Sequence, residues 1–180
     1  MKHPNKNPKI RTKNQSPRKI NWPSNAKTAG MKLISGAPSH NLLELVNKKV
    51  REYDIKMVIR NQWPGDKLYY TPSYAYELIK DLDKHIGLCL DVGHAQRSRL
   101  DPAQDIIQFR DRLHDVDLKD EAKSSNKGMT IECGKGVVDL AKVLRALLKI
   151  NYTSVVAFEY ERDAGDPLPE SAAPVTSRDC

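Results

Sequence analysis

Cysteine and long apolar runs are scarce in this 180-residue sequence. It has three cysteines, Cys89, Cys133 and Cys180, whose spacing matches no paired metal-binding motif. This argues against a disulfide framework or a closed structural zinc site and makes a reducing cytoplasm the expected location. No apolar run is long enough to span a membrane, and the first thirty residues lack the apolar core of a signal peptide. The composition therefore favours a soluble protein with one domain.

Acidic residues are absent from residues 1–30, which carry eight Lys or Arg. Removing these eight charges from the net charge of +7 leaves −1 for residues 31–180. The stretch is also rich in Asn and Pro, so we expect residues 1–30 to form a disordered basic tail. Such an arm can bind nucleic acid or an anionic membrane through phosphate contacts, or it can have no binding role.

Strand and helix patterns alternate after residue 30. Apolar segments predict five strands, and helical periodicity or an early proline predicts the helices between them. The predicted strands are 31–35, 55–59, 86–90, 113–118 and 155–158, and the predicted helices are 41–53, 72–84, 102–112 and 138–149. A loop through Arg97 and Arg99 is expected after the third strand. This alternation predicts right-handed βα units and a parallel sheet.

The third predicted strand ends in Asp91, and His94 follows it beside a glycine. A strand that is apolar throughout is typical of a parallel sheet, where ligand-binding side chains collect at the carboxyl ends of the strands. Asp91 and His94 would then face a metal or a substrate. Alternatively, Asp91 caps the following helix and His94 satisfies a loop.

The other predicted strands also end in or near polar residues, namely Arg60, Asp117, Lys119 and Glu159. Because parallel strands end at the same rim of a barrel or sheet, we expect these side chains to converge on one site. Two or three carboxylates with a histidine suit Mn²⁺, Mg²⁺ or Zn²⁺. The alternative is that each acid caps its own helix, although no clear helix follows Glu159.

Four segments in this order carry a resemblance to a known family: 87–94, 112–120, 134–136 and 156–160. Together with the loop that starts at Arg60, they resemble the sugar phosphate isomerase/epimerase family with the xylose-isomerase-like TIM barrel. The resemblance implies an α/β fold, a partial (β/α)8 barrel of parallel strands that match strands four to eight, with the N-terminal strands missing. We expect this barrel over residues 31–168, followed by a loose C-terminal tail over residues 169–180.

The resemblance also implies a function. Family members bind one divalent metal at the carboxyl-terminal mouth of the barrel and isomerise or epimerise sugars. Asp91 matches the family's metal-binding aspartate, Glu159 its metal-binding glutamate and catalytic base, and His94 its substrate-contacting histidine. In this chemistry the base removes a proton beside a carbonyl group and the metal stabilises the resulting enediolate. We therefore expect a small-molecule sugar or sugar phosphate as the substrate.

Two positions depart from the family pattern. Arg60 stands where the family has a glutamate or histidine, and Asp117 stands where it has a histidine. Aspartate can still bind Mn²⁺ or Mg²⁺, so we keep Asp117 as an expected metal ligand. A guanidinium has no lone pair to donate, so we expect Arg60 to bind substrate or stabilise an enediolate and to impair metal-dependent catalysis.

Three further residues are assigned on weaker grounds. Lys119 and Asp120 are expected to contact substrate, and a simple surface pair is the alternative. Trp63 is expected either to stack on a sugar face or to cover the barrel rim.

Missing barrel strands would leave the first and last strands of the sheet with open edges. Open edges favour self-association or aggregation.

A second function stays open beside the enzyme. The chain could be a non-catalytic binding or assembly module with a basic arm that binds nucleic acid.

Overall fold

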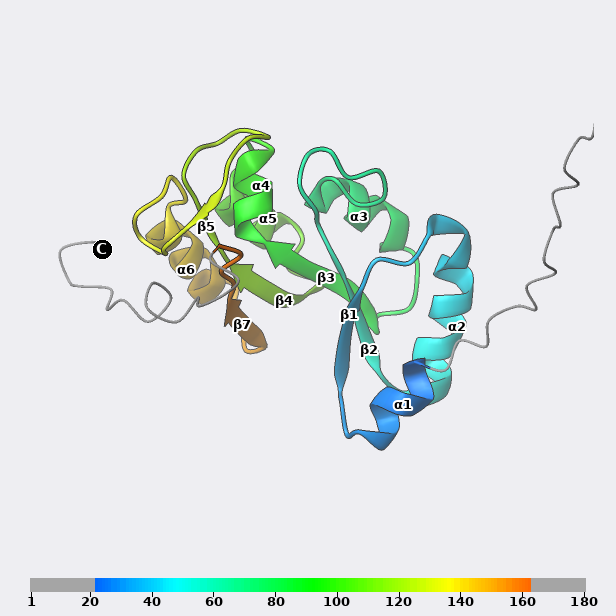
Figure 1. Cartoon of the computed structure of the whole chain (residues 1–180). Helices are drawn as coiled ribbons and strands as arrows, with labels where there is room; N and C mark the ends of the chain where they lie inside the picture. Colours follow the sequence, from blue (N-terminus) through cyan, green and yellow to red (C-terminus); the bar gives the residue numbers. More distant parts are fainter. Residues whose placement is uncertain (1–21, 163–180) are drawn as a thin grey trace, which may run out of the picture.

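The computed structural model describes residues 22–162, and Figure 1 shows its strands and helices. Five parallel strands form one sheet in the order β1-β2-β3-β4-β7. They are β1 (Leu33–Gly36), β2 (Lys56–Arg60), β3 (Ile86–Asp91), β4 (Leu113–Leu118) and β7 (Val155–Phe158). The short strands β5 (Asp120–Glu121) and β6 (Thr130–Ile131) form a separate antiparallel pair.

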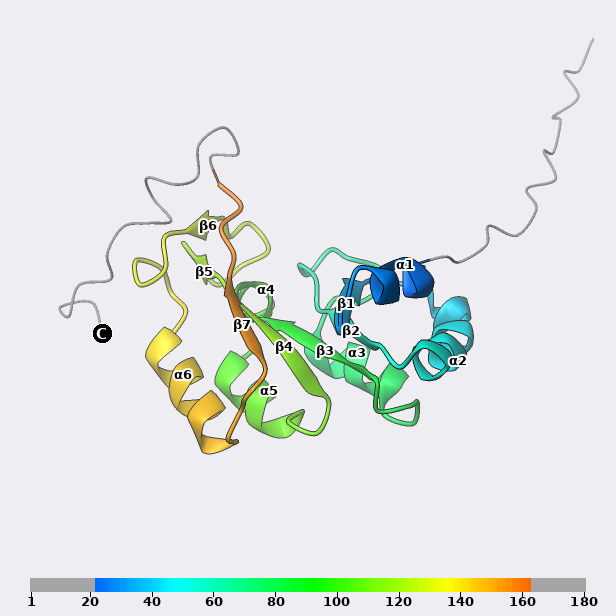
Figure 2. The same ribbon diagram turned by 90° about the horizontal axis from the view of Figure 1, so that it is seen from below.

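Helices alternate with the strands along the chain. They are α1 (Trp22–Thr28), the 3-10 helix η1 (His40–Leu42), α2 (Leu43–Tyr53), α3 (Pro72–Ile79), α4 (Val92–Arg97), α5 (Pro102–Gln108) and α6 (Leu140–Lys149). Figure 2 shows the curled sheet with α2, α3, α5 and α6 on its outer side. The parallel strands and their helices form a half-barrel, which confirms the predicted α/β class and the partial barrel.

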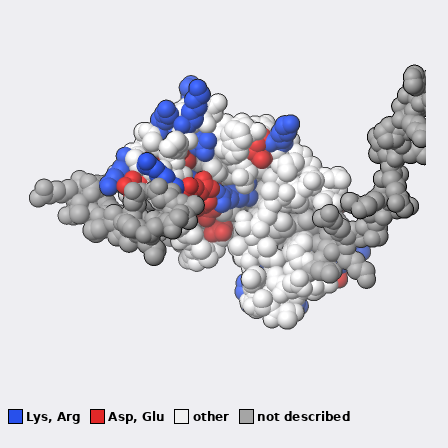
Figure 3. Space-filling view, in the orientation of Figure 1, with Lys and Arg blue, Asp and Glu red and all other residues white. Residues whose placement is uncertain are grey.

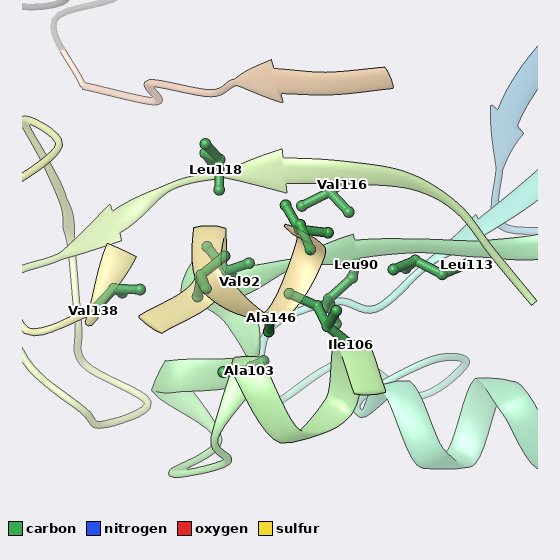
Figure 4. Packing of buried hydrophobic residues seen from close by; sticks show 12 residues of the cluster. Leu90, Val92, Ala103, Ile106, Leu113, Val116, Leu118, Val138 and Ala146 are labelled. Carbon is green, nitrogen blue, oxygen red and sulfur yellow. The ribbon is translucent and has the colours of Figure 1, made fainter. Parts of the chain in front are cut away.

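The core fills the space between the sheet and its outer helices. Around β3 and β4, Leu90 and Val116 meet Ile106 of α5 and Ala146 of α6 (Figure 4). A second cluster of buried residues lies around β2, α2 and α3 and contains Val50, Ile59 and Ile79, among others. Since side chains alternate across a strand, the neighbours of Leu90 and Val116 point to the opposite, inner face of the curl.

Strand register brings the polar ends of the strands to one level. Asp91 of β3 pairs with Asp117 of β4. Asp117 in turn pairs with Ala157 of β7, two residues before Glu159. With side chains alternating in direction, Asp91, Asp117 and Glu159 therefore share the inner face near the carboxyl ends of the strands.

Part of the expected basic tail is helical. Helix α1 occupies residues that the sequence analysis assigned to this tail, because Pro23 and Ala26 are buried and Trp22 packs against the second core cluster. Residues 1–21 of this tail and the C-terminal tail of residues 169–180 lie outside the described residues. The proposed nucleic-acid-binding role of the basic arm therefore stays a prediction.

Two predicted segments between β3 and β4 differ from the structure. The expected loop through Arg97 is wrong, because α4 starts directly after β3, where the Asp91 side chain accepts a hydrogen bond from the His94 backbone N–H. The helix predicted over 102–112 ends at Gln108, before a turn that contains Arg112. Asp caps of this kind stabilise a helix N-terminus, which explains why a short α4 forms.

Arg112 ties the turn before β3 to the start of β4. Its side chain is among the largest fully buried ones. The guanidinium donates hydrogen bonds to the backbone carbonyls of Lys80 (2.6 Å), Leu82 (2.6 Å), Asp83 (2.8 Å) and Ile86 (2.9 Å). These contacts satisfy the carbonyls left free where the chain departs from the helix after α3. They also explain why this helix ends before the predicted residue 84.

Asp120 holds the segment that leads into α6. The sequence suggested a substrate contact or a surface pair, but this side chain is fully buried. Its carboxylate accepts hydrogen bonds from the backbone N–H groups of Glu121, Gly134, Gly136 and Val138, at 2.8 to 3.1 Å. A Cβ at Gly136 would lie 2.2 Å from Asp120 Oδ1, so a glycine is required for this close approach.

The half-barrel has open edges in the part of the chain that the structure describes. β1 and β7 are the outer strands, and β7 exposes Val155 and Phe158, the latter at 73%. Self-association through these edges stays a prediction. None of the helices in residues 22–162 has the length and apolar character needed to cross a membrane.

Replacing Arg112 by leucine should lower the free energy of unfolding by about 3 kcal/mol or more, because several buried carbonyls lose their hydrogen-bond donor. Urea denaturation followed by circular dichroism measures this. The exposed Arg110 offers a matched control, and Arg110→Leu should change stability by less than about 0.5 kcal/mol. Equal losses in the two variants would contradict the role of Arg112.

Asp120→Ala should also cost about 3 kcal/mol or more, because four backbone N–H groups lose their acceptor. The control is Asp139→Ala, which removes only the exposed cap of α6 and should cost about 1 kcal/mol. The same denaturation experiment compares them. A loss at Asp120 no larger than that at Asp139 would show that the buried carboxylate is not an anchor.

Candidate active site

Three carboxylates converge at the carboxyl ends of the strands. Asp91 ends β3, Asp117 lies in β4, and Glu159 directly follows β7. One oxygen from each lies within 4.8 Å of the others. We call Asp91, Asp117 and Glu159 the carboxylate trio. Figure 3 shows acidic side chains gathered beside basic ones on this part of the molecule.

Arg60, at the end of β2, contacts all three members of the trio. Its Nη2 lies 2.8 Å from both Asp91 Oδ2 and Glu159 Oε1, and its Nε lies 3.5 Å from Asp117 Oδ2. Burial opposes the charge on the guanidinium, but the surrounding carboxylates outweigh it and raise the pKa of Arg60. The guanidinium therefore remains charged and holds the trio together.

Lys119 brings a second positive charge from the loop after β4. Its side chain is fully buried, and its Nζ lies 3.2 Å from Asp91 Oδ2, 3.4 Å from Glu159 Oε1 and 2.9 Å from Glu161 Oε2. Burial disfavours this charge, but the three acids outweigh it and raise the pKa of Lys119. The surface-pair alternative is thus wrong for Lys119. A Cβ at Gly93, the residue before His94, would lie 2.8 Å from the Lys119 side chain. The glycine therefore leaves the space through which the Lys119 side chain extends.

Asp91 has two functions at once. Its Oδ1 accepts the hydrogen bond that caps α4, while its Oδ2 faces Arg60 and Lys119. Asn61 fixes this strand end, because its side chain donates to the Asp91 carbonyl (3.0 Å) and accepts from the Asp91 N–H (2.9 Å). The helix-cap interpretation of Asp91 is therefore confirmed, and its role as a metal or substrate ligand stays a prediction.

His94 lies at the edge of the same cluster. Its Nε2 is 3.5 Å from Asp91 Oδ2, and its side chain is 5% exposed. Burial lowers the pKa of His94 to about 4, so the imidazole is neutral near pH 7. The buried Nδ1 has no hydrogen-bond partner in the structure. The ring can therefore offer a neutral polar group to a ligand.

Glu159 presents one occupied and one free oxygen. Oε1 contacts Arg60 and Lys119, whereas the buried Oε2 has no hydrogen-bond partner in the structure. Burial raises the pKa of Glu159 to about 7, against the opposing effect of Lys119 and Arg60. A carboxyl group with such a pKa can take up and release a proton near neutral pH.

Sequence reasoning missed three polar residues around the site. Asn61 and Glu161 had a usable signal, because Asn61 follows Arg60 and Glu161 lies two residues after Glu159, on the same face of an extended chain. Glu121 had none, since it falls between the strand predicted over 113–118 and the helix predicted over 138–149. Glu121 is fully buried, neither oxygen has a hydrogen-bond partner, and burial raises its pKa to about 7.

Trp63 lies in the loop after β2 and is 45% exposed. Its ring covers Gly65, where a Cβ would lie 2.0 Å from the nearest ring carbon. The loop glycine therefore allows the indole to fold back onto its own loop, and half of the indole remains open to solvent. Its role in binding a sugar stays a prediction.

The carboxylate trio suits a divalent metal in donor type and spacing. Hard and borderline divalent cations favour carboxylate oxygens. With metal–oxygen distances of about 2.0–2.2 Å, two oxygens on one ion lie at most about 4.4 Å apart. The trio, with oxygens within 4.8 Å, needs only a small contraction to reach this geometry. The donors thus fit the metal, although the Arg60 guanidinium contacts the same three side chains.

Comparison with known proteins gives one family match. The family model of the xylose isomerase-like TIM barrel matches residues 39–177. A comparison with curated proteins gave no match.

Several solved structures have the same fold. The IolI protein with a bound zinc atom superposes with a TM-score of 0.72 at 20% identity, covering 85% of this chain and 62% of that protein. A D-tagatose 3-epimerase-like protein gives 0.69 at 19% identity, covering 84% and 64%. The probable 3-DHS dehydratase AsbF from Bacillus anthracis gives 0.68 at 13% identity, covering 84% and 65%. This chain spans less than two thirds of each of these proteins.

The similarity to these solved structures shows the fold of this chain, and the match to the family model shows its family. The matched segment includes four of the five strands of the half-barrel and the whole carboxylate trio. Its fold neighbours include a sugar-epimerase-like protein and a probable dehydratase. This chain therefore belongs to the xylose isomerase-like TIM barrel family.

Proposed function

We propose that this chain acts as a sugar isomerase or epimerase that moves a proton at the carbon beside a carbonyl group. The substrate class is a small-molecule sugar or sugar phosphate, and the expected location is the cytoplasm. The family supports the reaction class, because its fold neighbours include a D-tagatose 3-epimerase-like protein.

The observation that carries the proposal is the geometry of Glu159. One of its oxygens is fixed by Arg60 and Lys119, and the other is buried without a hydrogen-bond partner in the structure. A base with one anchored and one free oxygen is oriented for proton abstraction. Glu159 Oε2 is therefore assigned as the atom that removes the proton from the substrate carbon.

The neighbouring side chains are assigned to substrate binding. Lys119 and Arg60 place positive charge beside Glu159, where negative charge would develop on a substrate oxygen. His94 supplies a neutral imidazole with a free ring nitrogen. Trp63 offers an apolar surface in the loop after β2. These residues would orient the substrate, and only Glu159 would exchange a proton with it.

Asp91, Asp117 and Glu159 would hold a divalent metal such as Mn²⁺, Mg²⁺ or Zn²⁺. When bound, the metal would supply a positive charge that polarises the substrate carbonyl. The bound zinc of the IolI protein and the trio of this chain both support a metal of this class.

Proton transfer is tested by incubating the full chain with Mn²⁺ and a panel of ketoses and ketose phosphates in D₂O. Deuterium should enter at the carbon beside the carbonyl group, and NMR measures its incorporation. Glu159→Gln should lower the exchange rate by about 100-fold or more, because the amide cannot accept the proton. Glu44→Gln, on the exposed side of α2, is the matched control and should leave the rate unchanged.

Two results would contradict this assignment. One is an absence of deuterium in every sugar when Mn²⁺ is bound to the folded wild type. The other is a Glu159→Gln variant as fast as the wild type.

Metal binding is tested separately by isothermal titration calorimetry with Mn²⁺. We expect one ion per chain, and at least about tenfold weaker binding by Asp91→Asn and Asp117→Asn, since each loses a charged ligand. Asparagine at position 91 can still cap α4, so loss of binding there would not reflect loss of the helix. Unchanged affinity in both variants would show that Mn²⁺ binds elsewhere.

A further inference from the structure

The chain places its own cation among the carboxylates that would hold the metal. We propose that Arg60 is a built-in competitor for that metal: the carboxylate trio binds either the guanidinium or a divalent cation, but not both. This inference rests on the proposed metal site and adds a condition for its occupancy: with the metal bound, Lys119 and the metal, in place of Arg60, would hold Glu159 Oε1.

The first argument is steric. Arg60 Nη2 lies 2.8 Å from Asp91 Oδ2 and 2.8 Å from Glu159 Oε1, so a single nitrogen bridges two of the three expected ligands. An ion bound to these two oxygens at about 2.1 Å, on the side that the guanidinium occupies, would overlap this nitrogen. On that side the metal can therefore enter only after the guanidinium has moved.

The second argument is electrostatic. A guanidinium is charged at every accessible pH, so it repels a divalent cation and does not become a ligand. The repulsion is strong because Arg60 is largely buried, with 22% of its side chain exposed, and buried charges are poorly screened. Arg60 therefore lowers metal affinity by its charge as well as by its volume.

The third argument is that the guanidinium has a second partner nearby. Glu161 Oε1 lies 3.6 Å from Arg60 Nη2, and the Glu161 side chain is 47% exposed. Arg60 can thus leave the trio and still pair with a carboxylate at the rim. Lys119 has no such freedom, because its side chain is fully buried. The exchangeable cation is therefore Arg60.

The charge balance permits this exchange. Four carboxyl groups, the trio and Glu161, surround two cations, Arg60 and Lys119. When all four acids are ionised, the cluster has an excess of two negative charges. A divalent ion would neutralise this excess, so the site can attract a metal even though the guanidinium already occupies it.

The experiment is a Mn²⁺ titration of the full chain by calorimetry, with wild type compared with Arg60→Met and Arg60→Lys. Arg60→Met should bind Mn²⁺ at least tenfold more tightly, because the competing cation is gone. Arg60→Lys keeps the charge and should remain within about threefold of the wild type. Arg51→Met is the control, since Arg51 is 58% exposed and pairs with Asp83 away from the trio; its affinity should match the wild type.

Thermal unfolding without metal is the second measurement. Without Mn²⁺, Arg60→Met should melt at least about 3 °C below the wild type, because Lys119 then remains as the counter-ion of Asp91 and Glu159, and Asp117 loses its contact with the guanidinium. Mn²⁺ should raise its melting temperature more than that of the wild type. A variant that folds only when Mn²⁺ is present would support the proposal in the same way.

The outcomes separate the two proposals. Equal Mn²⁺ affinity in wild type and Arg60→Met would overturn the competition and leave the metal site standing. No Mn²⁺ binding by either folded protein would overturn the metal site and the competition with it. Tighter binding in Arg60→Lys as well as in Arg60→Met would also overturn the proposal, because a retained charge would then not compete.

Discussion

The bridge between Arg60 and the carboxylate trio is the interaction on which the inner face of this half-barrel depends. Parallel strands bring Asp91, Asp117 and Glu159 to the same rim, where three negative charges would repel one another. The guanidinium spans β2, β3, β4 and the end of β7 in one group. Lys119 offsets part of this repulsion at Asp91 and Glu159, and the guanidinium, or a metal in its place, would offset the rest, including that at Asp117.

The outer and inner faces of the sheet have different chemistry. Leu90 and Val116 pack against the outer helices, so the apolar core supplies the stability of the strands. Asp91 and Asp117, one residue further along each strand, point to the inner face. Away from the site, the buried Arg112 links the turn before β3 to the start of β4 through hydrogen bonds to backbone carbonyls. Because the apolar outer face stabilises the sheet, the polar side chains of the inner face can be held in fixed positions.

The sequence predicted the strands and the polar rim well because both depend on local patterns. β4 and β7 have their predicted bounds, and continuous apolar segments indicated the buried β3. Helix α4 was missed, because a six-residue helix has too few periodic positions and only the Asp91 cap marks it. The end of α3 and the position of the Arg60 side chain depend on tertiary contacts, which local sequence patterns do not show. Arg112 ends α3 early through carbonyls about thirty residues away, and the position of the Arg60 guanidinium within the trio depends on four strands meeting.

The most direct measurement is a pair of crystal structures of the wild-type chain, without metal and with saturating Mn²⁺, using the anomalous signal of manganese. Without metal, we expect the Arg60 guanidinium between the three carboxylates. With Mn²⁺, an anomalous peak should lie among Asp91, Asp117 and Glu159, with the guanidinium turned toward Glu161. A peak among these carboxylates with the guanidinium still in contact with Asp91 and Glu159 would contradict mutual exclusion of the two cations.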